Sequence, residues 1–144
     1  MSQKPTPKKW LGDTGATVHV TEDLNYLINP SPCNNEVLVG GSETQTATHV
    51  GSTTITMNNL KIHLKRVIYV PNFGKNIISI NKILDNTGEM TSDKHKTVVK
   101  IKHKILTFER MKNSTLRYLT HIDENRDEIF SNDIKKQIDI NTPS

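Results

Sequence analysis

Short β-prone segments, separated by turn residues, recur along this chain and constrain its fold more than any other feature. Apolar and polar residues alternate in 18–21, in 60–64 and again in 98–108, as they do in strands that bury one face. Strands this short and closely spaced are typical of an all-β barrel or sandwich. The 144 residues suffice for one domain, and a hydrophobic fraction of 33% predicts a modest core.

Other segments carry signals for turns and for one helix. A compact apolar run at 76–79 passes into apolar residues at helical spacing, which predicts a strand running into a short helix that ends near Gly88. The Pro- and Asn-rich segment 29–35 is expected to be a loop, and Asn58-Asn59 a turn. We expect strands at 18–21, 36–39, 44–50, 51–57, 60–70, 76–79 and 98–108.

The glycine-rich stretch between two β-prone runs at 36–39 and 44–50 predicts a hairpin with a flexible tip. One interpretation is a plain surface hairpin. The other is a mobile flap that closes over a bound peptide. In the second case the covering residues would be Val39, Gly40, Gly41 and Ser42.

Positive charge is concentrated in the first 120 residues. The formal net charge is +4, and 121–144 holds six acidic residues against three basic ones, so this segment carries −3 and the rest carries +7. Lys100, Lys102 and Lys104 alternate with Ile101, His103 and Ile105, and we expect the lysines on one face of an exposed edge strand, where lysines discourage unwanted pairing. A nucleic-acid-binding stripe is the alternative interpretation, although we do not expect nucleic acid as a partner.

Several kinds of site are not expected. The single cysteine, Cys33, has no partner for an internal disulfide and is interpreted as a partly buried small residue. The six histidines show no metal-binding spacing, and His19 is interpreted as a structural histidine. We therefore expect no metal and no cofactor. No apolar run approaches the roughly 20 residues of a membrane span.

The segment Trp10–Thr17 presents an acid for chemistry. An apolar pair leads into Asp13-Thr14-Gly15, and Ala16 and Thr17 follow. A carboxylate at the tip of such a turn can be held by backbone N–H groups and hydroxyls, and Gly15 lets another backbone approach closely. The alternative is an ordinary Asp-Gly turn.

Two separated motifs together resemble a known family. The first is Trp10–Thr17, and the second is Val67-Ile68-Tyr69-Val70-Pro71 followed by Asn76-Ile77-Ile78-Ser79. In this order, with a glycine hairpin between them, they resemble the retropepsins, and among these the proteases of Ty1/copia-type retrotransposons. The resemblance covers about residues 10–90, with looser similarity to 119. Many retropepsins have glycine where this chain has Ser79, a departure that the copia type shares.

The resemblance implies a fold and a domain organisation. The fold would be an all-β, closed β-barrel-type structure with a flap hairpin and one short helix, active as a symmetric homodimer. Residues 1–9 would be an extended lead-in, 10–120 the protease domain and 121–144 a polar tail, either mobile or forming a short helix. Asn76, Ile77, Ile78 and Ser79 would support the catalytic loop from behind.

The resemblance also implies a mechanism. Two carboxylates held about 3 Å apart share one proton, and the ionised one activates a water that attacks the peptide carbonyl. This chain has one such aspartate, Asp13, so the site would need two copies. Thr14 would reach the partner's loop, Gly15 would admit substrate backbone, and Thr17 would orient the carboxylate. The expected substrate is the element's own polyprotein, cut in the cytoplasm within a retrotransposon particle.

Two other functions are also compatible with the sequence. The chain could be a catalytically silent retropepsin-like module kept for dimerisation or binding, with the motif residues retained by descent. It could also be a small basic nucleic-acid-binding β-domain. Peptide cleavage that depends on Asp13 distinguishes the first function from both alternatives.

Overall fold

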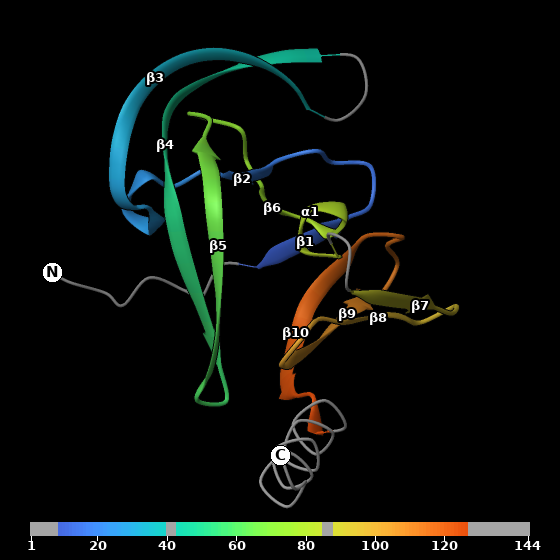
Figure 1. Ribbon diagram of the computed structural model, residues 1–144. Helices are drawn as coiled ribbons and strands as arrows, with labels where there is room; N and C mark the ends of the chain where they lie inside the picture. Colours follow the sequence, from blue (N-terminus) through green and yellow to red (C-terminus); the bar gives the residue numbers. More distant parts are fainter. Residues whose placement is uncertain (1–8, 40–42, 85–87, 127–144) are drawn as a thin grey trace, which may run out of the picture.

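The computed structural model describes residues 9–39, 43–84 and 88–126. Within these ranges the chain is mostly β-strand, with one short α-helix and one 3₁₀ helix, arranged as shown in Figure 1. The elements in chain order are β1 (Trp10–Asp13), β2 (His19–Thr21), η1 (Leu24–Tyr26), β3 (Ile28–Val39), β4 (Glu43–Met57), β5 (Leu60–Tyr69), β6 (Asn76–Ser79), α1 (Ile80–Leu84), β7 (Glu89–Ser92), β8 (Lys96–Lys100), β9 (Lys104–Arg110) and β10 (Arg117–Glu124).

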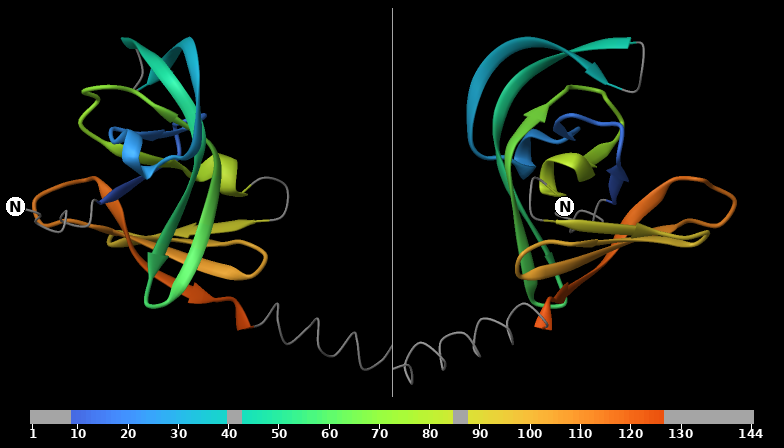
Figure 2. Two further views of the ribbon diagram at one scale, coloured as in Figure 1. Left: turned by 90° about the vertical axis from the view of Figure 1, so that its left-hand side faces the viewer. Right: turned by 45° about the vertical axis from the view of Figure 1, so that its right-hand side comes forward.

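The strands form one strongly curved sheet in the order β3-β4-β5-β2-β6-β1-β10-β9-β8-β7. The expected all-β class is confirmed, but the expected closure is wrong, because the edge strands β3 and β7 do not pair with each other in the described part of the chain. Strands β8 and β7 extend the sheet beyond β9, away from β3, and run across the direction of β4 and β5 (Figure 2). The two edges therefore stay apart.

The three short strands at the centre of the sheet are buried on both faces. In β6 all four residues are buried, and β1 begins with buried Trp10 and Leu11. Successive side chains of a strand point to opposite faces, so Trp10 and Ile78 join one apolar cluster with Phe108, while Leu11 joins a second cluster on the other face. The short apolar runs of the sequence thus become the middle of the sheet.

The segment 29–35 is part of strand β3, so the predicted loop is wrong. β3 is an edge strand, and an edge tolerates prolines because one side of it makes no ladder hydrogen bonds. The pairing of β3 with β4 is interrupted between Ile28 and Ser31 and between Pro32 and Asn35. These irregularities accommodate Pro- and Asn-rich sequence within a strand.

Two strand boundaries also differ from the prediction. The segments 44–50 and 51–57 form the single strand β4, and 98–108 is divided between β8 and β9. A tight turn separates β8 from β9 and is closed by the N–H of Ile101, which donates to the carbonyl of Lys104 at 2.9 Å. β8 lies between β7 and β9, so the prediction of one exposed edge strand carrying three lysines is wrong.

Other local predictions are confirmed. Asn58 and Asn59 both have positive φ, 53° and 66°, as a tight hairpin turn between β4 and β5 requires. Strand β6 runs directly into α1, and the N–H of Gly88 donates to the carbonyl of Leu84 at 2.8 Å. Asp85, between them, lies outside the described residues.

Strand β10 continues to Glu124, beyond the domain boundary predicted at residue 120. Ile122 in this strand is fully buried in the cluster that contains Trp10. Residues 121–124 are therefore part of the sheet. Residues 1–8 and 127–144, which hold the rest of the predicted lead-in and tail, lie outside the described residues.

Candidate active site at Asp13

Asp13 ends strand β1 at the centre of the sheet, and its carboxylate is held by the turn that follows. The N–H of Gly15 donates to Asp13 Oδ1 at 2.7 Å. The side chain is half-buried, while Thr14, Gly15 and Thr17 are exposed. The hydroxyl of Thr17 makes no hydrogen bond to Asp13 within the described part of a single chain. A structured turn therefore presents the acid at the surface.

The second motif lies directly beside the first. β1 and β6 pair in parallel, with Asp13 opposite Ser79. The buried hydroxyl of Ser79 donates to the carbonyl of Ala16 at 2.6 Å. Parallel pairing thus brings together two segments that lie more than 60 residues apart, and the side chain of one fixes the loop of the other.

A second contact fixes the same loop. Asn81 in α1 donates through Nδ2 to the carbonyl of Thr14 at 2.6 Å. The loop after Asp13 is therefore tied to α1 through Thr14 and to β6 through Ala16. The sequence predicts no role for Asn81, because nothing in the local pattern of α1 distinguishes it from a solvent-facing polar residue.

The remaining residues of the second motif support the strands. Asn76 is buried, and its Oδ1 accepts from the hydroxyl of Thr21 at 2.7 Å and from the N–H of Glu22 at 3.1 Å. These bonds hold the end of β2 to β6. Ile77 and Ile78 are buried on opposite faces of the sheet, in the two apolar clusters.

His19 is a buried structural residue, as expected. Its Nδ1 accepts the backbone N–H of Ser79 at 2.9 Å, so the ring proton must sit on Nε2. Burial, and secondarily the charge of Lys82, lower the pKa of His19 to about 4. The imidazole is therefore neutral at pH values near 6, and it holds the residue whose hydroxyl fixes the Asp13 loop.

The shifted pKa of His19 predicts a loss of stability in acid. The unfolded chain, with a histidine pKa near 6.5, binds a proton that the folded chain excludes until about pH 4. The free energy of unfolding should therefore fall by up to about 3 kcal/mol as the pH drops from about 6.5 to about 4. Urea unfolding at several pH values measures this fall. His19→Asn keeps an acceptor near the Nδ1 position and should remove most of the slope, and an unchanged slope would contradict the assignment.

The hydroxyl of Ser79 should contribute to stability as well. Ser79→Ala leaves the carbonyl of Ala16 without its buried donor and is expected to cost about 1–3 kcal/mol. The midpoint of thermal unfolding measures the cost. Ser31→Ala, at an exposed position of the edge strand β3, serves as a control. Equal midpoints for the two variants would show that the hydroxyl does not hold the loop.

A pocket of about 320 Å³ opens beside Asp13. One wall is the end of β1 and the start of α1, including Gly12, Asp13 and Ile80. The other wall comes from β7 to β10 and includes Phe108 and Arg117. The position of β7 to β10 beside Asp13 does not follow from the local sequence pattern, because only the pairing of β10 with β1 brings these strands there.

The predicted flap is described in part. β3 and β4 pair out to Val39 and Glu43, and the hairpin arches above β2 and β6 (Figure 1). Val39 is described through its backbone, and Gly40, Gly41 and Ser42 lie outside the described residues. Cys33 on β3 is half-buried, and its thiol lies 3.4 Å from the carbonyl of Ala47.

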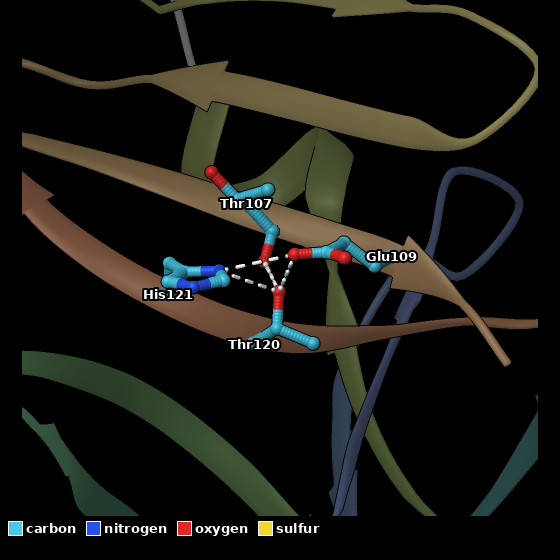
Figure 3. Close-up of polar contacts among 4 residues, drawn as sticks. All are labelled: Thr107, Glu109, Thr120 and His121. Carbon is cyan, nitrogen blue, oxygen red and sulfur yellow. Dashed lines mark hydrogen bonds and ion pairs between the residues drawn. The ribbon is translucent and has the colours of Figure 1, made fainter.

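A second polar cluster joins β9 and β10 (Figure 3). The Thr120 hydroxyl lies 2.8 Å from Glu109 Oε1 and 2.9 Å from His121 Nδ1, and this Nδ1 lies 3.1 Å from the same Glu109 oxygen. A nucleophilic triad uses different ring nitrogens for the nucleophile and for the acid. Here Nδ1 of His121 contacts both the Thr120 hydroxyl and the Glu109 carboxylate, and the side chains of His121 and Glu109 are well exposed. The cluster is therefore a surface contact between strands at the bulge after Leu119.

No three His, Cys, Asp or Glu side chains of the described ranges converge to hold a metal ion. Helices in those ranges are too short or too polar to cross a membrane.

Comparison with known proteins identifies the family. The family described as "Pol polyprotein, beta-barrel domain" matches residues 10–89, which contain both motifs. Two Arabidopsis thaliana proteins, the retrovirus-related Pol polyproteins from transposons RE1 and RE2, are each 36% identical to the chain, over 81 and 84 residues. These matches cover 55% and 57% of this chain but only 6% of each relative. No solved structure gives a significant match. The chain belongs to the family of Pol polyprotein β-barrel domains.

Proposed function

We propose that this chain is an aspartic endopeptidase that acts as a homodimer. The observation that carries the proposal is the fixed presentation of Asp13: Gly15 holds its carboxylate, and Ser79 and Asn81 hold the turn around it. A half-buried acid in a rigid turn beside a 320 Å³ pocket is suited to acid–base chemistry on a bound ligand.

The proposed mechanism uses two copies of Asp13. Brought together on a two-fold axis, the carboxylates would share one proton, because two like charges at such a distance cannot both ionise. The ionised carboxylate takes a proton from water, the resulting hydroxide equivalent attacks the peptide carbonyl, and the other carboxyl donates to the carbonyl oxygen. The C–N bond then breaks as the first carboxyl returns its proton to the leaving amine, which leaves a new carboxyl terminus and a new amino terminus. The apparent pKa values then belong to the pair.

Thr14, Gly15 and Ala16 have positions that suit this arrangement. The exposed Thr14 would contact the partner's loop, and Gly15, which has no side chain, would let the substrate backbone approach. The β3–β4 hairpin would cover an extended peptide through main-chain hydrogen bonds. Thr17 would orient the carboxylate only after the second copy is in place.

The two relatives are named as Pol polyproteins from transposons, which supports a proposal for the origin of this chain and for its substrate. We propose that the chain derives from a Pol polyprotein of a retrotransposon and cuts that polyprotein, within a cytoplasmic retrotransposon particle. Lys100, Lys102 and Lys104 lie in β8, in the turn after it and in β9, so they do not form a stripe along one strand. Nucleic-acid binding therefore loses the lysine stripe that supported it. A silent dimerisation module is the competing function.

Cleavage of a complex peptide mixture tests the proposal. The full chain is incubated between pH 4 and 7, and new ends are identified by mass spectrometry in H₂¹⁸O. We expect at least one ¹⁸O in each new carboxyl terminus, since the attacking water supplies one of its two oxygens. A proven dimer of the chain that produces no new ends would favour the silent module.

A further inference from the structure

We propose that the pocket beside Asp13 is a subsite that selects a glutamate side chain of a bound polypeptide, with Arg117 as the specificity-determining residue. This inference rests on the proposed function for its substrate class. It adds which side chain the site prefers and which residue selects it.

The pocket touches the proposed catalytic acid directly. Asp13 and Thr14 lie in one wall, so a side chain that enters the pocket brings its own peptide group close to Asp13. The opposite wall consists of residues outside the 10–89 segment shared with the family, among them Ser92, Thr97 and Arg117. Selectivity would therefore come from the part of the chain that the family match does not cover.

Arg117 is held in a fixed orientation within this wall. One guanidinium nitrogen donates to the hydroxyl of Thr97 at 2.9 Å, and the other donates to the carbonyl of Asp93 at 2.6 Å. A guanidinium has five N–H donors, so donors remain for a ligand. Its planar fork matches a carboxylate, and holding it in place before binding reduces the entropy lost on binding.

The rest of the pocket suits the length and the polarity of glutamate. Ile80, Phe108 and Leu116 provide apolar surface for the two methylene groups. The Ser92 and Thr97 hydroxyls lie 2.6 Å apart, and Thr97 is almost fully buried. An aliphatic side chain would exclude water from the remaining N–H donors of Arg117 without replacing the hydrogen bonds of that water, which is costly.

The charges of the lining favour an acidic ligand. Among the described residues that line the pocket, Arg117 is the sole cation and Asp13 the sole anion. In the proposed mechanism two copies of Asp13 share one proton and carry one negative charge. The carboxylate of a bound glutamate would lie on the Arg117 side, where the charge is complementary.

Peptide binding to the full-length Asp13→Asn variant tests this inference without requiring cleavage. The probes are octapeptides of neutral residues in which one position, scanned in turn, is Glu, Gln or Leu. Calorimetry measures the Kd. At one position we expect the Glu peptide to bind about ten-fold more tightly than the Gln peptide, on the scale of a charge-assisted hydrogen bond.

Arg117 variants in the same background identify the selecting residue. Arg117→Met should abolish the preference for Glu, and Arg117→Lys should retain part of it, because lysine keeps the charge but loses the fork. Circular dichroism checks the fold of each. If Arg117→Met does not fold, the Glu–Gln comparison together with Arg117→Lys decides. Equal binding of Glu and Gln peptides, no binding, or a preference that survives Arg117→Met overturns the inference.

Cleavage by the wild-type chain separates this inference from the proposed function. Cleavage without a glutamate preference would overturn the proposed glutamate subsite but would support the proposed protease activity. Glutamate-selective binding that requires Arg117, with no cleavage of any peptide, would support the subsite and overturn the protease.

Discussion

Asp13→Asn is expected to reduce peptide cleavage by about 10³-fold or more, the scale expected when an acid–base group is lost from the chemical step. Asparagine has nearly the same shape, and its oxygen can still accept the Gly15 N–H that now bonds Asp13 Oδ1 at 2.7 Å. It cannot ionise or exchange the shared proton. The measurement is kcat/KM for a peptide found in the cleavage screen.

A matched control accompanies this variant. Asp123→Asn removes an exposed carboxylate on β10 and should leave kcat/KM unchanged. Both variants should unfold at urea concentrations close to that of the wild type, because neither substitution removes a buried group. If the Asp13→Asn variant retains cleavage, Asp13 is not the catalytic acid.

Gly12→Ala is expected to cause the largest loss of stability from the smallest change in structure. A Cβ at Gly12 would lie 2.5 Å from Cδ2 and 2.8 Å from Cε2 of Phe108. Phe108 is fully buried and packs in the main apolar cluster, so its ring has little room to move. Overpacking of this kind typically costs about 1–3 kcal/mol. Because the Phe108 ring has little room to move aside, we expect Gly12→Ala to lower the free energy of unfolding by an amount at the upper end of this range.

Urea unfolding measures this effect. Gly15→Ala is the matched control, since its Cβ would approach nothing nearer than Asp13 Oδ1, at 3.3 Å, and should change stability less. Phe108→Leu should recover part of the loss in the double variant, because the two sites are in contact. An unfolding midpoint for Gly12→Ala equal to that of the wild type would contradict the packing of β9 beneath β1.

Local signals in the sequence sufficed where a short segment determines its own structure. The Asn58-Asn59 turn and the passage from β6 into α1 follow from residue preference and periodicity, and both are confirmed. The sequence predicts a loop at 29–35 because prolines and asparagines interrupt strands in most contexts. Only its place at the edge of the sheet allows it to be a strand.

Contacts between distant segments were harder to predict. The resemblance to the retropepsins implies that Ser79 supports the Asp13 loop, but not that His19 accepts the N–H of Ser79 or that Asn81 donates to the carbonyl of Thr14. Phe108 and Arg117 lie beside Asp13 because β10 pairs with β1. No local sequence pattern near either residue predicts this pairing. The contribution of such residues to the site can be inferred only when the strand order is known.

Subunit mixing tests the central claim, that one active site requires two copies of Asp13. Wild-type chain and Asp13→Asn are unfolded and refolded together at varied ratios and constant total concentration, and cleavage is measured. If only dimers with two Asp13 residues cleave, activity follows the square of the wild-type fraction, about a quarter of full activity in an equal mixture. A linear dependence, about half in an equal mixture, would show that each chain acts alone and would contradict the shared site.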